Sequence, residues 1–343
     1  MTMSQCRSNG QGPRVFAVSF SLTTLLFALG CSETKTEEPA SSGPFKSLEA
    51  VANAPQAFSA PRAGVPLADG SVAFIATLEG QPSGESDERS ESGKRVAVLL
   101  QPPGNGEVST LYTGDLLVSP LDIALSVDER TLYIADPAAG EDGLGALLTL
   151  DVSGGEPSVV LAGSRPRAVT VSDQGEVYFS GNSEDGAQPG VFLLSGDRAS
   201  AVFTGPPLVD PSGIAIRKDG TLLVADTRLF DGETELGSEA GIIRISEGQA
   251  SIWASGFATG YPAGVALTLD EKTLIISGEG PDRSDTVYLV DTNAPATPPG
   301  VVTASFSAFQ DSSAGLKRAR SSNTFIWASL AEGGGTVYRI VAN

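Results

Sequence analysis

The sequence has no histidine, only two cysteines and few basic residues. Its 343 residues include 22 Lys and Arg against 41 Asp and Glu, a net charge of −19. Without histidine, Ser-His-Asp catalysis, Cys-His catalysis and histidine-ligated zinc are excluded. The shortage of Lys and Arg argues against nucleic acid as a partner, because phosphate binding needs clustered positive charge. Hydrophobic residues make up 41% of the chain, which excludes a disordered acidic protein.

The first 30 residues have the pattern of a secretory signal peptide. They contain two arginines and no acid, and residues 15–29 form an uncharged, mostly apolar run. That run is short for a membrane-spanning helix, which needs about 20 apolar residues. We therefore predict a signal peptide over residues 1–30, with a permanent anchor helix as the alternative.

The stretch ALGC that ends at Cys31 resembles the bacterial lipoprotein box. The resemblance implies that Cys31 carries lipid and becomes the mature N-terminus, and Ser32 after it favours the outer membrane. The mature chain would lose two arginines and no acid, which changes its net charge from −19 to −21. It would also lose Cys6, so no disulfide or cysteine nucleophile is expected in the folded part.

Residues 31–44 are polar and lack hydrophobic periodicity, so they are predicted to be a flexible tether. The predicted protein is thus an exported bacterial lipoprotein, most consistent with the outer membrane. Its domain would face either the periplasm or the cell surface.

From residue 45 onward, one pattern of short strands recurs six times. Each copy has a first strand, a polar turn with Asp or Gly, a second apolar strand that ends in small or acidic residues, and two further strands. The first strands carry an equivalent residue at Gly64, Asp122, Ala168, Gly213, Gly264 and Gly315. The second strands end at Thr77, Asp136, Gly181, Asp226, Gly278 and Ser329. Six such copies predict an all-β, six-bladed β-propeller over residues 45–343.

The last copy supplies only three strands. The missing strand is predicted over residues 45–52, which would join the two chain ends and protect the sheet edges. A β-sandwich or another irregular all-β fold is the alternative. The predicted blades, in a protein expected to be a monomer, span residues 54–118, 119–163, 164–206, 207–257, 258–310, and 311–343 plus 45–52.

The segments SPLDIALSVDERTLYIADP and DPSGIAIRKDGTLLVADT resemble the NHL-repeat propellers and the SMP-30-like propellers, the gluconolactonase and luciferin-regenerating proteins. The resemblance implies the same architecture. For its lactonase branch it also implies a divalent metal held by Glu and Asn, with an Asp as base. Here Ser212 and Ala263 replace the Asn of the family's Pro-Asn-Gly element, and residues 59–67 lack the family Glu. These departures count against lactone hydrolysis.

Six loops that follow the second strands are predicted to open on one face of the propeller. They hold 19 of the 41 acids and four bases, and span residues 78–94, 136–143, 181–189, 226–239, 278–286 and 330–335. A focused negative potential attracts cations. This face is therefore predicted to take Ca²⁺ or another divalent cation, a cationic ligand or a basic partner. Ordinary solvated surface charge is the alternative, and no cofactor is certain.

Four acids are predicted as ligand contacts at a channel mouth: Asp136, Asp226, Asp122 and Glu279. Asp136 and Asp226 end second strands near the axis, where the small residues of other blades are expected to leave room. For these two, structural bracing through hydrogen bonds from turn amides is the alternative. No catalytic residue is assigned.

The leading functional hypothesis is a non-enzymatic propeller, anchored by lipid, that binds an unknown protein or small molecule. The second is a divalent-metal-dependent hydrolase of the lactonase type, for which carboxylates alone could supply ligands and acid–base groups. The third is a structural component of the envelope.

Overall fold

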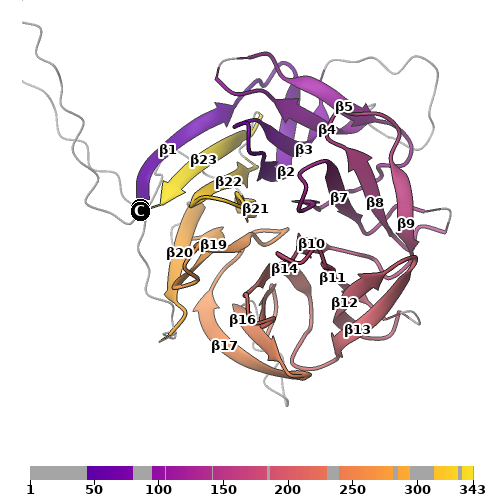
Figure 1. Ribbon diagram of the computed structural model, residues 1–343, viewed down its shortest axis with the longest axis vertical. Helices are drawn as coiled ribbons and strands as arrows, with labels where there is room; N and C mark the ends of the chain where they lie inside the picture. Colours follow the sequence, from indigo (N-terminus) through magenta and orange to yellow (C-terminus); the bar gives the residue numbers. More distant parts are fainter. Residues whose placement is uncertain are drawn as a thin grey trace, which may run out of the picture. The chain divides into compact units, whose positions relative to one another are not determined.

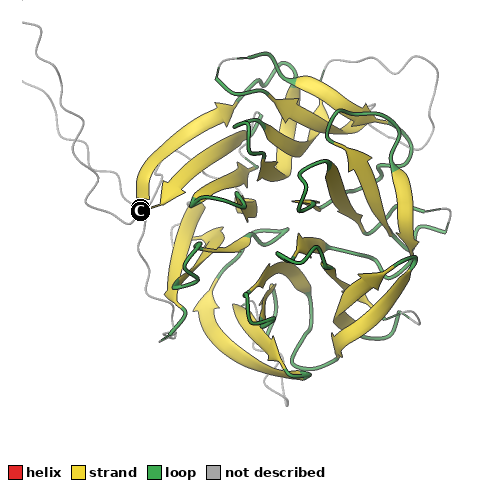
Figure 2. Cartoon of the chain, in the orientation of Figure 1, coloured by secondary structure: helices red, strands yellow, loops and turns green. Residues whose placement is uncertain are grey.

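The computed structural model describes residues 45–79, 95–104, 106–140, 142–183, 186–229, 239–280, 285–293, 313–330 and 334–342. All of these residues form strands, turns and loops (Figure 2). Within these ranges, no helix is long and apolar enough to cross a lipid bilayer. The predicted signal peptide, Cys31 and the tether lie outside the described residues and stay predictions.

Six antiparallel sheets stand around one axis, each with its first strand nearest the centre (Figure 1). The predicted six-bladed propeller is therefore confirmed. From the inner strand outward, blade 1 consists of β2 (Phe58–Pro66), β3 (Val72–Leu78), β4 (Arg95–Gln101) and β5 (Ser109–Thr113). Blade 2 consists of β6 (Asp122–Leu125), β7 (Thr131–Asp136), β8 (Ala146–Asp151) and β9 (Ser158–Ala162). Blade 3 consists of β10 (Ala168–Val171), β11 (Val177–Asn182), β12 (Pro189–Ser195) and β13 (Arg198–Thr204).

Blades 4 to 6 follow the same order around the axis. Blade 4 consists of β14 (Pro211–Ile216), β15 (Leu222–Asp226), β16 (Ala240–Ser246) and β17 (Gln249–Phe257). Blade 5 consists of β18 (Val265–Leu267), β19 (Thr273–Glu279) and β20 (Asp285–Asp291). Blade 6 consists of β21 (Ser313–Arg318), β22 (Thr324–Ser329), β23 (Thr336–Ala342) and β1 (Phe45–Ala52). The last residues of the predicted blade 5, 294–310, lie outside the described residues.

Blade 6 is built from both ends of the domain. β1 lies beside β23 (Figure 1) and pairs with it antiparallel, with Leu48 opposite Ile340 and Ala50 opposite Tyr338. The predicted closure by residues 45–52 is confirmed. Its physical benefit is that the outer edge of β23 is paired rather than left as a row of free backbone donors and acceptors.

The hairpins between first and second strands are held by short polar motifs. Asp69 and Asp219 accept hydrogen bonds from the N–H groups of Ser71 and Thr221, two residues later, at 2.8 and 2.9 Å. Such Asx turns close a hairpin without help from distant residues. These six axial hairpins span residues 67–71, 126–130, 172–176, 217–221, 268–272 and 319–323.

Two hairpins are also tied to their neighbours by glutamates in a left-handed backbone conformation. Glu129 and Glu271 both have φ of 57°. Their carboxylates accept the N–H of Ala68 and of Lys218, each at 2.7 Å, in the hairpin of the preceding blade. Non-glycine residues rarely adopt this conformation because it costs free energy, and the hydrogen bonds to the neighbouring blade offset that cost.

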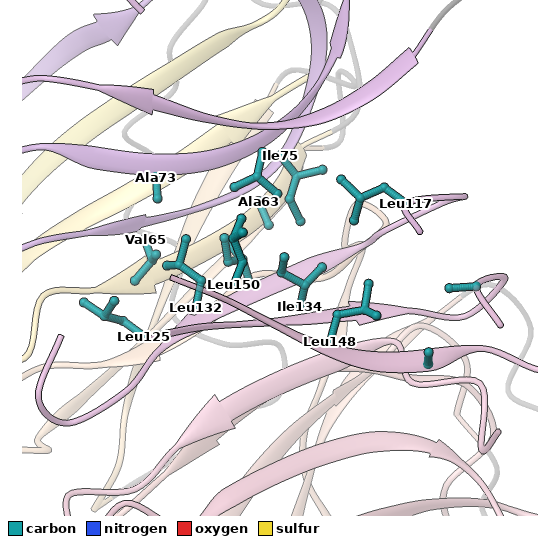
Figure 3. Packing of buried hydrophobic residues seen from close by; sticks show 14 residues of the cluster. Ala63, Val65, Ala73, Ile75, Leu117, Leu125, Leu132, Ile134, Leu148 and Leu150 are labelled. Carbon is teal, nitrogen blue, oxygen red and sulfur yellow. The ribbon is translucent and has the colours of Figure 1, made fainter. Parts of the chain in front are cut away.

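Apolar faces of neighbouring sheets pack together to form the cores between blades. Figure 3 shows the core between blades 1 and 2, where Val65 and Ile75 face Ile134 and Leu148. Ile75, Ile134 and Leu148 are fully buried. Because this packing uses the broad faces of the sheets, the inner strands are left to line the axis.

Candidate functional site

The inner strands bring equivalent residues into rings around the axis. One ring holds Gly64, Asp122, Ala168, Gly213, Gly264 and Gly315; the next, two residues further along each strand, holds Pro66, Ala124, Thr170, Ala215, Ala266 and Lys317. Each ring therefore contains one charged residue, Asp122 in the first and Lys317 in the second. The glycines of the first ring are packed closely against neighbouring blades: a β-carbon would lie 2.4 Å from the carbonyl oxygen of Ala263 at Gly213 and 2.3 Å from the nitrogen of Leu316 at Gly264.

Lys317, on β21 of blade 6, crosses the axis to blades 2 and 3. Its Nζ donates to Asp122 Oδ2 and to the carbonyl of Val169, both at 2.7 Å. The same carboxylate oxygen accepts the N–H of Val169 at 2.9 Å. The lysine and aspartate side chains are 12% and 4% exposed. Burial raises the pKa of Asp122, and the charge of Lys317 acts in the opposite direction. The pair thus ties together blades that do not adjoin in the ring.

A cavity of about 120 Å³ lies on the axis where the inner strands end. We call it the axial cavity, and its opening the hairpin mouth. All six inner strands contribute to its lining, which is mostly apolar but carries three cations and one acid. The lining residues are Val65, Pro66, Ala124, Leu125, Thr170, Val171, Asp173, Ile214, Ala215, Ile216, Val265, Ala266, Leu267, Lys317, Arg318 and Arg320.

Arg320 fixes one side of the hairpin mouth. Its Nε and Nη2 donate to the carbonyls of Ser126 and Leu125 at 3.1 and 2.7 Å, and its Nη1 lies 4.0 Å from Asp173 Oδ1. Burial lowers the pKa of Arg320, while Asp173 acts to raise it. Arg320 therefore links blade 6 to blade 2 by its hydrogen bonds and to blade 3 by its contact with Asp173.

Arg318 forms the other basic group of the mouth. Its Nη1 donates to the carbonyls of Ala319, Arg320 and Ser322 at 2.6, 3.2 and 3.4 Å. Among the ion pairs of the described residues, none includes Arg318. Burial lowers its pKa. The hairpin mouth is thus locally basic in a strongly acidic protein.

Asp136 lies at the opposite end of the axis, the loop mouth, where second strands end. It is fully buried and accepts four hydrogen bonds of 2.8–3.0 Å, from the N–H groups of Val118, Ser119, Ala138 and Ala139. Burial raises the pKa of Asp136, and these backbone donors lower it. The bonds join the loop that enters blade 2 to the turn after β7, which is the arrangement described by the bracing alternative.

Asp226 occupies the equivalent place in blade 4. It is fully buried and accepts the N–H groups of Val209, Asp210 and Arg228 at 2.8, 2.8 and 3.0 Å. Burial raises its pKa to about 6 although the three donors favour the ionised form. Both predicted carboxylates thus join the loop that enters their blade to the turn that follows the second strand.

The glycines that end the second strands of blades 3 and 5 are in close contact with neighbouring loops and do not open a space. A β-carbon at Gly181 would lie 2.2 Å from the carbonyl oxygen of Ser164, and one at Gly278 would lie 2.2 Å from that of Ala258. The loops between blades therefore cover these strand ends directly. The expectation that small residues leave room at this mouth is wrong for these two blades.

Glu279, the fourth predicted contact, ends β19, where its carbonyl accepts a hydrogen bond from the hydroxyl of Tyr288. The four acids are thus divided among blades 2, 4 and 5. Within the described part of the chain, no three His, Cys, Asp or Glu side chains are placed to hold a metal ion. Most acids of the six loops lie outside the described residues, so the divalent-metal site that the lactonase resemblance implies stays a prediction.

The acidic loop face stays a prediction, because 12 of its 19 acids lie outside the described residues. Of the seven that are described, Asp136, Asp226 and Asp285 are fully buried. The described residues of this mouth also include a cation, Arg62, whose Nη1 donates to Ser119 Oγ at 3.0 Å.

Sequence reasoning missed the basic residues Lys317, Arg318 and Arg320. A signal for the first was present: aligned copies place Lys317 where the other blades have Pro, Ala or Thr. Its partner Asp122 lies 195 residues away, so their contact required knowledge of how the ring closes.

Comparisons with known proteins show the fold alone. No protein-family model matches the chain, and no curated protein matches it. Among solved structures, it is similar to a putative oxidoreductase of the glucose dehydrogenase type from Thermus thermophilus, with a TM-score of 0.59 and 15% identity over 86% of this chain and 99% of that one. It is also similar to a PQQ-bound aldose sugar dehydrogenase from Streptomyces coelicolor, with a TM-score of 0.58 and 10% identity over 87% of this chain and 98% of that one. A gluconolactonase from Xanthomonas campestris gives a TM-score of 0.51 and 15% identity over 86% of this chain and 89% of that one.

Proposed function

We propose that this chain is a non-enzymatic binding propeller, exported and anchored to the bacterial envelope by lipid on Cys31, that takes a small ligand in the axial cavity. The observation that carries the proposal is the convergence of all six inner strands on one cavity of about 120 Å³. Apolar walls with a few convergent polar groups are the usual form of a small-molecule site. The small volume limits the ligand to a few heavy atoms.

The state of the axial carboxylates supports binding over catalysis. A general base must lie within reach of the substrate and be able to take its proton. Asp136 and Asp226 instead accept three or four backbone hydrogen bonds each, and Asp122 is paired with Lys317. Among the described residues of the axis, these acids serve the fold.

Binding without turnover is the test of this proposal. We expect a panel of small metabolite-sized compounds to contain at least one that raises the melting temperature of the chain, purified in nonionic detergent. At 100 times its Kd a ligand stabilises by about 2.7 kcal/mol, or roughly 4 °C for a domain of about 300 residues. The compound should be recovered chemically unchanged. A panel without any such shift would contradict a small-molecule binding role.

A second candidate is a divalent-metal-dependent hydrolase of the lactonase type, which the similarity in fold to the Xanthomonas gluconolactonase supports. It is tested in the same preparation with a sugar lactone, with added Ca²⁺ or with EDTA. Hydrolysis above the spontaneous rate that EDTA abolishes would favour this candidate and overturn the non-enzymatic proposal.

The lipid anchor gives an independent prediction. We expect mass spectrometry of the protein expressed in a bacterium to find an acylated cysteine at position 31 as the N-terminus. Cys31→Ser should remove the lipid and leave residues 1–30 attached, because the cysteine thiol is the group that receives the lipid. Cys6→Ser is the matched control and should leave lipidation unchanged. An unmodified N-terminus in the wild type would refute the anchor.

A further inference from the structure

The geometry points to a small organic monocarboxylate as the ligand of the axial cavity, with its carboxylate at Arg318 and its apolar tail against the strand ends. This inference rests on the proposed binding function and names its ligand class. It comes from the charge, the donors and the size of the cavity.

Of the three cations that line the cavity, Arg318 is the one that makes no direct ion pair with a described residue. Lys317, Arg318 and Arg320 contribute three positive charges. Asp122 lies 2.7 Å from Lys317 Nζ and Asp173 lies 4.0 Å from Arg320 Nη1. Arg318 belongs to no ion pair of the described residues, although the nearby carboxylates of Asp173 and Glu271 act to raise its pKa. Arg318 is therefore the cation of the lining that is placed to contact an incoming anion.

Arg318 also has donors for that anion. Its Nη1 is occupied by three carbonyl oxygens, while no described residue accepts a hydrogen bond from its Nε or Nη2. A guanidinium presents two parallel N–H groups that match the two oxygens of a carboxylate. Lys317 lines the same cavity with two of its three ammonium hydrogens already engaged. An incoming carboxylate can thus be bound without breaking the contacts that hold the mouth.

The rest of the lining favours a short apolar tail. Val65, Ile214, Val265 and Leu267 come from three different blades and line the cavity with part of their surface, while their side chains pack in the cores between blades. A cavity of about 150 Å³ accepts benzene, so about 120 Å³ accommodates roughly five or six heavy atoms. An inorganic anion would leave these apolar walls unused, and a longer acid would exceed the volume.

Isobutyrate and isobutyramide provide a matched pair of probes, because they have the same shape and differ in charge. We expect isothermal titration of the full chain in nonionic detergent to give isobutyrate a Kd of about 0.1–1 mM, as ligand efficiency for about six heavy atoms allows. Isobutyramide should bind at least tenfold more weakly. Arg318→Gln should weaken isobutyrate at least tenfold, and Arg198→Gln, the same charge change on an exposed outer strand, should not.

A second variant separates loss of the site from loss of the fold. Thr170→Leu places a larger side chain in the second ring without changing any charge. It should abolish isobutyrate binding while its melting temperature stays within about 2 °C of the wild type.

Three results would overturn the inference. They are equal affinity for acid and amide, phosphate binding as tight as isobutyrate, and no binding of isobutyrate by the folded chain. A panel without any shift in melting temperature contradicts the proposed function itself. A panel compound whose binding survives both Arg318→Gln and Thr170→Leu would instead show that the chain binds a small ligand outside the axial cavity.

Discussion

Replacing Lys317 with methionine should lower the free energy of unfolding by about 3–5 kcal/mol, which corresponds to a fall in melting temperature of roughly 5–8 °C for about 300 residues. The lysine is the partner of Asp122, whose side chain is 4% exposed. Methionine keeps the length and apolar stem of the side chain, so water is excluded and the carboxylate loses its counter-charge. Thermal and urea unfolding of the two proteins measure the difference.

The pH dependence of this variant follows from the same contact. In the wild type, burial raises the pKa of Asp122 and Lys317 opposes that rise. Without the lysine, the folded-state pKa moves further above its unfolded value. The folded variant then binds the extra proton more readily than the unfolded chain, so its stability is greatest at low pH and falls as the pH rises through the raised pKa. The loss relative to wild type should be smaller at about pH 5 than at about pH 8.

The double variant Asp122→Ala with Lys317→Met is the control for the pair. It removes both charges, and other blades already carry Gly or Ala at the Asp122 position. Replacing a buried ion pair by apolar groups is often close to neutral, so we expect the double variant to lie within about 2 kcal/mol of the wild type. A double variant as unstable as the sum of the singles would show that the two residues act independently.

Asp136→Ala should be the second strongly destabilising change, by about 3–5 kcal/mol. It removes the acceptor of four main-chain N–H groups, and each buried donor left without a partner costs about 1–3 kcal/mol before water enters. Asp136→Asn keeps one acceptor oxygen but turns an NH₂ group toward the same donors, so we expect an intermediate loss. Chemical denaturation gives both values.

Two comparisons distinguish bracing from ligand contact at Asp136. Asp142→Ala, in the exposed turn of the same blade, removes one hydrogen bond to Leu144 and should cost less than about 1 kcal/mol. Asp136→Asn should also leave isobutyrate affinity unchanged, since the axial cavity lies at the other mouth. A stable Asp136→Asn protein with altered ligand binding would support the ligand-contact role over bracing.

The architecture could be predicted from the sequence because its evidence is local and repeated. Each copy carries its own alternating strands and a polar turn between them, such as that of Asp219, which Thr221 closes within two residues. Six copies with three strands in the last one then imply closure by residues 45–52, and β1 does pair with β23. These features depend on neighbours in sequence or on the count of copies.

The acids predicted as ligand contacts lie at strand ends, but their role could not be derived from residue type. A carboxylate at a strand end is equally suited to a ligand and to turn amides, and only the path of the loop that enters blade 2 puts Val118 and Ser119 within 3.0 Å of Asp136. Likewise, Gly181 and Gly278 could indicate open space or close packing, and the inter-blade loops decide for packing.

The sequence by itself determined the number of blades, the closing strand and the exclusion of histidine chemistry, since each follows from local pattern or composition. The tertiary structure alone decided the charge balance at the hairpin mouth. That decision depends on Lys317 meeting Asp122 across 195 residues and on Arg318 being left without a carboxylate among the described ion pairs. Charge balance at an axis is a sum over all six blades, and it exists only when the ring has closed.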